Sequence, residues 1–193
     1  MGFFGLGRKD KKDGGSADSG GGGGKPCPLP DMTPQDLPVD QYRSSRLTYY
    51  DATSRTVLCT EQETPFPEGR LIVSRTDPEG IITHVNRAFV MMSGFSEEEL
   101  VGAPHYILRH PDMPAVAFKG LWDTLETDRY WNGYVKNLRK DGGFYWVYAT
   151  VIANIRDGKV IGYSSVRRKP ARRKVEECTT LYRSLLEQEQ AGG

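Results

Sequence analysis

The sequence predicts an α+β domain, in which an antiparallel sheet carries short helices on one face. Two groups of strand-like segments frame a central stretch with helical periodicity. Asp141-Gly142 and Asp157-Gly158 join the last three strands, and this dipeptide is among the strongest hairpin signals. Residues 77–80 (DPEG) predict a turn between the first two strands. The five expected strands are 71–73, 81–85, 132–139, 144–153 and 159–168.

Two short helices are expected after the first pair of strands. A helical patch covers residues 86–92. Ser96 and Glu99 then have the spacing of a capping box, and Phe95 and Leu100 are placed as its hydrophobic staple. These signals predict a second helix that begins at Ser96.

A longer helix is expected to begin near Asp112 or Met113, with Pro114 in its first turn. Its apolar residues recur at helical spacing, so one face is expected to be buried. We assign this face to the core rather than to a ligand. Its residues are Phe118, Leu121, Trp122 and Leu125.

The N-terminal third is expected to contain two different parts. Residues 1–44 are rich in glycine and proline, which predicts a disordered tail. Residues 45–70 are strand-like and are expected to form a cap segment before the main domain, 71–168. Both faces of the strand 144–153 are apolar, so both need a cover. The helices cover one face, and the cap segment or a partner chain is expected to cover the other.

Residues 171–190 contain no proline or glycine and predict a C-terminal signalling or dimerisation helix. Val175, Cys178, Tyr182 and Leu185 step by 3, 4 and 3 residues, which is coiled-coil spacing over two heptads. A helix of this length is marginal alone and needs a surface. That surface is either the exposed sheet face of the same chain or the same helix of a second chain.

Composition excludes several classes of protein. The formal net charge is +1, which gives no global field for nucleic acid or an anionic membrane. No apolar run is long enough to span a membrane and no secretory signal is visible, so a cytoplasmic location is expected. Three scattered cysteines and three histidines form no metal motif, and no catalytic set stands out. The six cations within 167–174 are interpreted as a solvated helix entry or a patch for an acidic partner.

The order of elements resembles the PAS domain, and several motifs strengthen the resemblance. Residues 76–86 (TDPEGIITHVN) fit PAS domains in general. Residues 109–114 (RHPDMP), together with Trp131 and Asn137, are similar to the FAD-binding PAS sensors of bacterial aerotaxis receptors. The resemblance implies a bacterial, non-enzymatic chemotaxis-type sensor that binds FAD non-covalently and reports redox or oxygen status. Those receptors carry a membrane anchor and a signalling coiled coil that this sequence lacks, so a separate signalling protein is the expected partner.

The resemblance implies six cofactor-binding residues. Arg109 would bind the pyrophosphate, Trp131 would form a wall for the ring, and Asn137 would hydrogen-bond the edge of the ring. His110 is a flavin contact or a loop histidine. Asp112 either contacts the cofactor or caps the helix that follows it, and Asn86 either reaches the ring or caps the helix at 86–92.

Two other functions remain open at the level of the sequence. A haem-binding PAS gas sensor would use His110 or His105 as the axial ligand. A PAS interaction module without any ligand would have neither cofactor. The chain has no cysteine near residues 105–110, so it does not resemble LOV photoreceptors, which need a thiol there.

Overall fold

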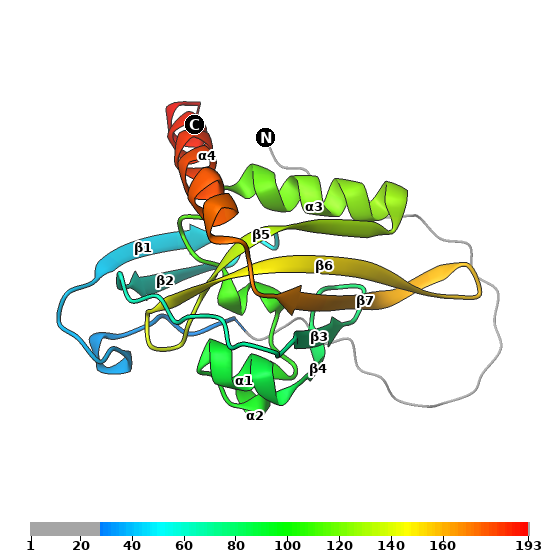
Figure 1. Ribbon diagram of the computed structural model, residues 1–193, viewed down its shortest axis with the longest axis horizontal. Coiled ribbons are helices and arrows are strands. Elements are labelled where there is room, and N and C mark those ends of the chain that lie inside the picture. Colours follow the sequence, from blue (N-terminus) through cyan, green and yellow to red (C-terminus); the bar gives the residue numbers. More distant parts are fainter. Residues whose placement is uncertain (1–27, 193) are drawn as a thin grey trace.

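Five antiparallel strands form the main sheet of the computed structural model, which describes residues 28–192. The strands lie in the order β4-β3-β7-β6-β5, so the last strand of the chain pairs with the first strand of this sheet (Figure 1). The predicted α+β class and five-stranded antiparallel sheet are confirmed. The elements are η1 (Pro34–Asp36), β1 (Arg43–Thr48), β2 (Ser54–Cys59), β3 (Ile72–Thr76), β4 (Ile82–Val85), α1 (Arg87–Ser93), α2 (Glu97–Leu100), η2 (His105–Leu108), α3 (Ala115–Asp128), β5 (Tyr130–Leu138), β6 (Phe144–Arg156), β7 (Lys159–Arg168) and α4 (Arg172–Ala191).

The two hairpins of the sheet form where Asp-Gly predicts them. Asp157 and Gly158 have φ values of 50° and 75°, the positive values that a type I′ turn requires at both central positions. The strand β6 continues to Arg156, beyond the expected end at 153. It passes an irregularity in register after Asn154, so the hairpin is longer than the sequence pattern predicts.

The short helices begin at the predicted caps. The Asn86 side chain accepts from Phe89 N at the start of α1, and Ser96 and Glu99 form the capping box of α2. The helix α3 begins at Ala115 rather than at Asp112 or Met113, and Pro114 is its N-cap. The reason is local, because a residue that precedes proline is disfavoured in the helical region and Met113 is such a residue.

We call the side of the sheet covered by α1, α2 and η2 the inner face. Phe89 from α1, Leu100 from α2 and Leu108 from η2 pack there against Tyr145 and Val147 of β6. The helix α3 runs beside β5 (Figure 1), and its Trp122 contacts Tyr163 of β7 edge to face with ring centroids 5.3 Å apart. The helices between β4 and β5 therefore gather on one face, as expected.

The opposite, outer face is covered in part by α4. Val175 is buried against Phe144 and Trp146 of β6, with Cys178 and Tyr182 beside them. The cover expected from residues 45–70 or from a partner chain is thus supplied, in part, by the C-terminal helix of the same chain. Of the two surfaces considered for this helix, the structure has it on its own sheet, while Leu181 faces away and is 53% exposed.

The hairpin β1–β2 forms a separate two-stranded sheet at one end of the domain (Figure 1). It packs on Leu138 and on Tyr106, whose ring stacks on Tyr49 with centroids 3.9 Å apart. Of the predicted tail, residues 1–27 lie outside the described residues, and residues 28–44 contact the domain. Met32 is buried and donates its N–H to Thr56 O at 2.9 Å, because its apolar side chain completes the core of the hairpin.

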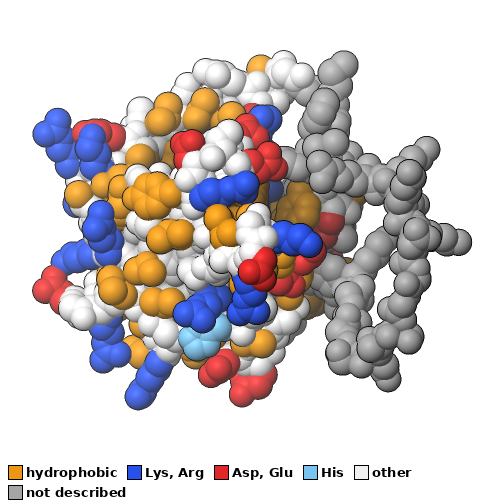
Figure 2. Space-filling model, turned by 90° about the vertical axis from the view of Figure 1, so that its right-hand side faces the viewer, with side chains coloured by type: hydrophobic (Ala, Val, Ile, Leu, Met, Phe, Trp, Pro, Cys, Tyr) orange, Lys and Arg blue, Asp and Glu red, His pale blue; other side chains and the backbone are white. Residues whose placement is uncertain are grey.

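Charge is segregated in the fold although the sequence is nearly balanced. The five strands of the main sheet contain no aspartate or glutamate, whereas they carry arginine and lysine. Figure 2 shows hydrophobic side chains mixed with Lys and Arg on one side of the molecule. None of the helices within residues 28–192 is long and apolar enough to cross a membrane.

Candidate functional site

The inner face of the sheet forms an apolar floor under the short helices. Its largest side chains have almost no solvent exposure, as expected for the best-packed part of a domain. Trp131 and Val135 of β5 pack at its border. The buried cluster consists of Phe66, Ile72, Ile82, Val85, Ala88, Phe89, Met92, Phe95, Leu100, Ile107, Leu108, Tyr145, Val147 and Ala149.

Three buried polar atoms on this floor form no hydrogen bond of ordinary geometry within residues 28–192. They are the side-chain amide nitrogen Nδ2 of Asn137, the hydroxyl of Tyr145 and Oγ of Ser165. Asn137 and Tyr145 lie directly opposite each other on β5 and β6. An unsatisfied buried polar group costs about 1–3 kcal/mol, so three together indicate a place that a polar partner would complete.

Two small residues of this apolar face, Gly133 of β5 and Ala149 of β6, lie directly opposite each other. The indole of Trp131 lies over Gly133, and a Cβ added at that glycine would come within 2.4 Å of the ring. Only glycine permits this arrangement, so the position of Trp131 depends on it. Trp131 thus lies at the border of the inner face, where the resemblance expects an aromatic wall.

Arg109 lies beside Asn137, and the two residues form an isolated antiparallel bridge between the loop after η2 and β5. The guanidinium lies over the ring of Phe118, 5.2 Å from its centroid, and donates weakly to Thr48 O at 3.4 Å. Its Nε is buried and has no partner in the described part of the chain. Burial lowers the pKa of Arg109. The structure therefore brings together two residues that are distant in the sequence. Nε of Arg109 and Nδ2 of Asn137 can each still donate a hydrogen bond.

His110 is 1% exposed, and its ring lies edge to face on Phe144 of the outer face, with centroids 5.8 Å apart. Its Nδ1 accepts from the backbone N–H of Asp112 at 3.1 Å, so the proton of the neutral ring is on Nε2, which has no partner. Burial, followed by the charge of Lys136, lowers the pKa of His110 to about 3. His110 therefore offers a donor N–H at neutral pH.

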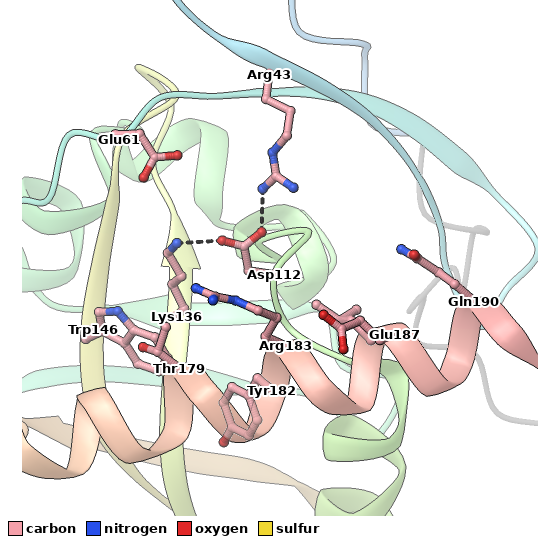
Figure 3. Close-up of a pocket in the computed structure, with 11 residues that line it drawn as sticks. Arg43, Glu61, Asp112, Lys136, Trp146, Thr179, Tyr182, Arg183, Glu187 and Gln190 are labelled. Atoms are coloured by element: carbon pink, nitrogen blue, oxygen red, sulfur yellow. Dashed lines mark hydrogen bonds and ion pairs between the residues drawn. The ribbon is translucent and has the colours of Figure 1, made fainter.

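Asp112 has a different role from both that the sequence left open. It pairs with Lys136 Nζ at 2.7 Å and with Arg43, and these contacts hold its pKa at about 2 against the opposing effect of burial. It does not cap α3, because Pro114 is the N-cap of that helix. Asp112, Lys136 and Arg43 line a cleft of about 520 Å³ between β1, β5 and α4, on the outer side of the sheet (Figure 3).

The side-chain amide of Asn86 forms hydrogen bonds with backbone groups of the fold. Its Oδ1 accepts from Val73 N at 3.1 Å and Phe89 N at 3.0 Å, and its Nδ2 donates to Leu71 O at 2.9 Å. The side chain therefore joins β3 to the start of α1. Of the two roles considered for Asn86, the structure supports the cap.

Arg167 is the residue that sequence reasoning missed. The run of cations at 167–174 was interpreted as a solvated helix entry or a patch for an acidic partner, but Arg167 is 3% exposed and lies on the inner face opposite Ala149. Its guanidinium donates to Ser74 Oγ at 3.1 Å and contacts His105 Nε2 at 2.7 Å. The alternation of strand side chains could have found it, since Tyr163, Ser165 and Arg167 share one face by the period of two.

The contact with Arg167 occupies Nε2 of His105. Burial and the charge of Arg167 lower its pKa to about 3, so the ring is neutral and its Nε2 lone pair faces the guanidinium. An axial haem ligand needs that lone pair free. Among the described residues, no group of three or more His, Cys, Asp or Glu side chains could hold a metal ion.

These residues fit a flat, largely apolar ligand with a polar edge and a negative charge. The floor supplies apolar walls, Asn137 and Tyr145 supply unpaired hydrogen-bonding atoms, and Arg109 and Arg167 supply positive charge. Sites for small ligands combine these features. The fold and these buried polar residues together have the character of an α+β sensor domain.

Comparison with known proteins identifies the family. Residues 82–167 match the family described as the PAS fold. The chain is 42% identical over 126 residues to the aerotaxis receptor of Escherichia coli K12, a match that covers 65% of this chain and 25% of the receptor. It is 32% identical over 80 residues to the bacterioopsin transcriptional activator of Halobacterium salinarum, covering 42% of this chain and 12% of that protein. A solved PAS domain from Colwellia psychrerythraea is similar at 21% identity and a TM-score of 0.49, covering 53% of this chain and 87% of that one.

The chain contains a PAS domain, and the expected family is confirmed. It spans about a quarter of the length of the aerotaxis receptor. The similarity therefore concerns only part of that protein.

Proposed function

We propose that this protein is a PAS sensor that binds FAD non-covalently and relays redox status to a separate signalling protein in the cytoplasm. The observation that carries the proposal is the group of unpartnered polar atoms of Asn137, Tyr145 and Ser165 on a buried apolar face. They lie within the part of the fold that matches the PAS family, and the chain is similar to an aerotaxis receptor.

The residues of the site have distinct proposed roles. Asn137 and Tyr145 hydrogen-bond the edge of the isoalloxazine ring, which alternates donors and acceptors, and Trp131 bounds it. Arg109 binds the diphosphate, because a planar guanidinium suits phosphate oxygens. His110 has no role at the ring in this proposal, because its side chain lies against Phe144 on the outer face. Bound flavin would supply a ring that takes up one or two electrons.

The absorption spectrum of the purified full chain tests this proposal. We expect yellow protein, either as purified or after incubation with FAD, and release of FAD rather than FMN on denaturation. A Soret band would instead favour a haem sensor, and protein that stays colourless with FAD would favour an interaction module without a ligand. Either of these results would overturn the proposal.

Two variants with matched controls test the site itself. Asn137→Ala and Arg109→Ala should each weaken FAD binding by about 1–3 kcal/mol, which is the cost of a lost buried or charged hydrogen bond. Asn132→Ala and Arg168→Ala are the controls, because both side chains are exposed on the same sheet. Unchanged binding in both test variants, with circular dichroism that indicates a folded domain, would remove this site from the proposal.

A further inference from the structure

Arg167 is a buried cation without an anionic partner among the described residues. Its guanidinium contacts Ser74, His105 and the face of the Phe89 ring, 5.1 Å from the ring centroid. Each of these groups is neutral, and the strands around it contain no carboxylate. Buried charges are normally paired, because an isolated charge is costly to remove from water.

The charge of Arg167 persists at neutral pH. Burial lowers its pKa only to about 10. His105 does not compete for the proton, since its own pKa is held near 3 and its Nε2 accepts from the guanidinium. The cation is therefore fixed in place by neutral groups.

Arg167 also lies next to the smallest side chains of the inner face. It lies opposite Ala149, the small residue that pairs with Gly133 on the floor. Its charge acts on the hydroxyl of Tyr145, which is one of the three unpartnered polar atoms. A ligand held by Asn137 and Tyr145 would thus lie within the field of Arg167.

We propose that Arg167 stabilises the negative charge that the flavin ring acquires on reduction. This inference rests on the proposed function. When an external donor gives the oxidised, neutral ring two electrons and one proton reaches N5, the ring retains one negative charge near N1 and C2=O. A nearby positive charge favours this anion over the doubly protonated neutral form, and charge near N1 is a known way for a protein to tune a flavin.

The dependence of the flavin reduction potential on pH tests this assignment. With two electrons and one proton, the two-electron potential falls by about 30 mV per pH unit, and with two protons it falls by about 59 mV per pH unit. We expect the smaller slope for the FAD-loaded full chain between pH 6 and 7, titrated with sodium dithionite. In Arg167→Gln the slope should approach the larger value. At pH 8 the equilibrium constant for two-electron reduction should also fall at least tenfold, or about 30 mV.

Matched variants separate charge from packing. Arg167→Lys retains the charge and should keep the smaller slope, whereas Arg168→Gln removes the exposed neighbouring charge and should leave both quantities unchanged. Arg167→Met, which is neutral and of similar length, replaces the glutamine variant if circular dichroism shows that the latter is unfolded. A neutral variant that binds FAD and keeps the wild-type slope and potential overturns the inference while the proposed function stands. Wild-type protein that binds no FAD overturns both.

Discussion

At the scale of single residues, two asparagines illustrate two kinds of buried amide. Asn86 is engaged by the backbone of Leu71, Val73 and Phe89, so its role is complete within the chain. Asn137 is 4% exposed and its Nδ2 has no partner. The degree of burial does not distinguish a structural asparagine from one that is available to a ligand. The hydrogen-bond partners of the side chain do.

The two asparagines should therefore differ in their effect on the stability of the flavin-free protein. Asn86→Ala should lower the free energy of unfolding by about 1–2 kcal/mol, because it removes a helix cap and two links to β3. Asn137→Ala should change it by less than about 0.5 kcal/mol, since it removes a group that has no partner. Urea denaturation of flavin-free protein measures both values. Equal losses would show that Asn137 also has a structural role.

His105 and His110 predict how stability depends on pH. Both have folded-state pKa values near 3, below the ordinary value of 6.5, so the folded protein binds fewer protons than the unfolded chain. Their contribution is fully present above pH 6.5 and is lost as the pH falls from 6.5 towards 3. Each histidine should add a slope of about 1.4 kcal/mol per pH unit within that window.

The variant His110→Gln tests this slope. Urea denaturation between pH 6 and 4.5 should give a smaller slope for the variant than for the wild type, by about one proton. His84→Gln is the matched control, because His84 is exposed on β4. The same slope in His110→Gln and in the wild type would contradict the assignment of a buried, neutral His110.

At the scale of elements, the local signals in the sequence predicted most of the sheet and the short helices. The Asp-Gly turns and the capping box depend on neighbouring residues only, and both are present in the structure. The start of α3 was predicted two to three residues too early, since Pro114 was taken as a residue of the first turn. The cover of the outer face was assigned to residues 45–70 or to a partner chain, because periodicity gives the apolar faces of two elements but not their pairing.

One contact between elements was not predictable from sequence patterns, because the residues that it joins are more than 70 positions apart in the sequence. Glu189 of α4 accepts from the free N–H groups of Ala115 and Val116, at 3.1 and 2.9 Å, where Pro114 provides no side-chain cap for α3. A carboxylate at a helix N-terminus satisfies unpaired donors and interacts favourably with the helix dipole.

Removing this contact should loosen both helices. Glu189→Ala should lower the free energy of unfolding by about 1 kcal/mol, which is typical for loss of a cap. Amide hydrogen exchange should become faster at Ala115 and Val116 and in the last turns of α4. Gln188→Ala is the matched control, because the Gln188 side chain is exposed in the same turn. Exchange unchanged at Ala115 and Val116 would show that the contact does not hold these helices together.

At the scale of the whole molecule, the sequence predicted the fold better than the site. The resemblance predicted Arg109, Trp131 and Asn137 as site residues, and these residues border the inner face. It also included Asp112, which instead pairs with Arg43 and Lys136 on the outer side. Arg167 was missed because the basic run around it was interpreted as one unit, whereas the alternation of side chains along β7 places Arg167 on the same face as Ser165.

The same long-range contacts connect the site to α4. The Tyr182 hydroxyl donates to Tyr134 O on β5, the strand that carries Asn137, at 2.8 Å. Glu189 holds the start of α3, directly after the loop that carries Arg109. The C-terminal helix therefore contacts both elements that would respond to a change at the ring. Coupling between two sites requires such contacts to differ between two states.

This arrangement predicts that reduction of bound flavin changes hydrogen exchange in α4, and that the change depends on Tyr182 and Glu189. The double variant Tyr182→Phe/Glu189→Ala should bind FAD like the wild type, because neither side chain lies on the inner face. It should lose at least half of the difference in exchange between oxidised and reduced protein across α4. Leu181→Ala is the control, since its exposed side chain lies on the same helix and should leave that difference intact. If the double variant retains the full difference, the signal reaches α4 by another path. If wild-type α4 exchanges equally in both states, α4 is not the output element, because a helix that reports the state of the ring must differ between those states.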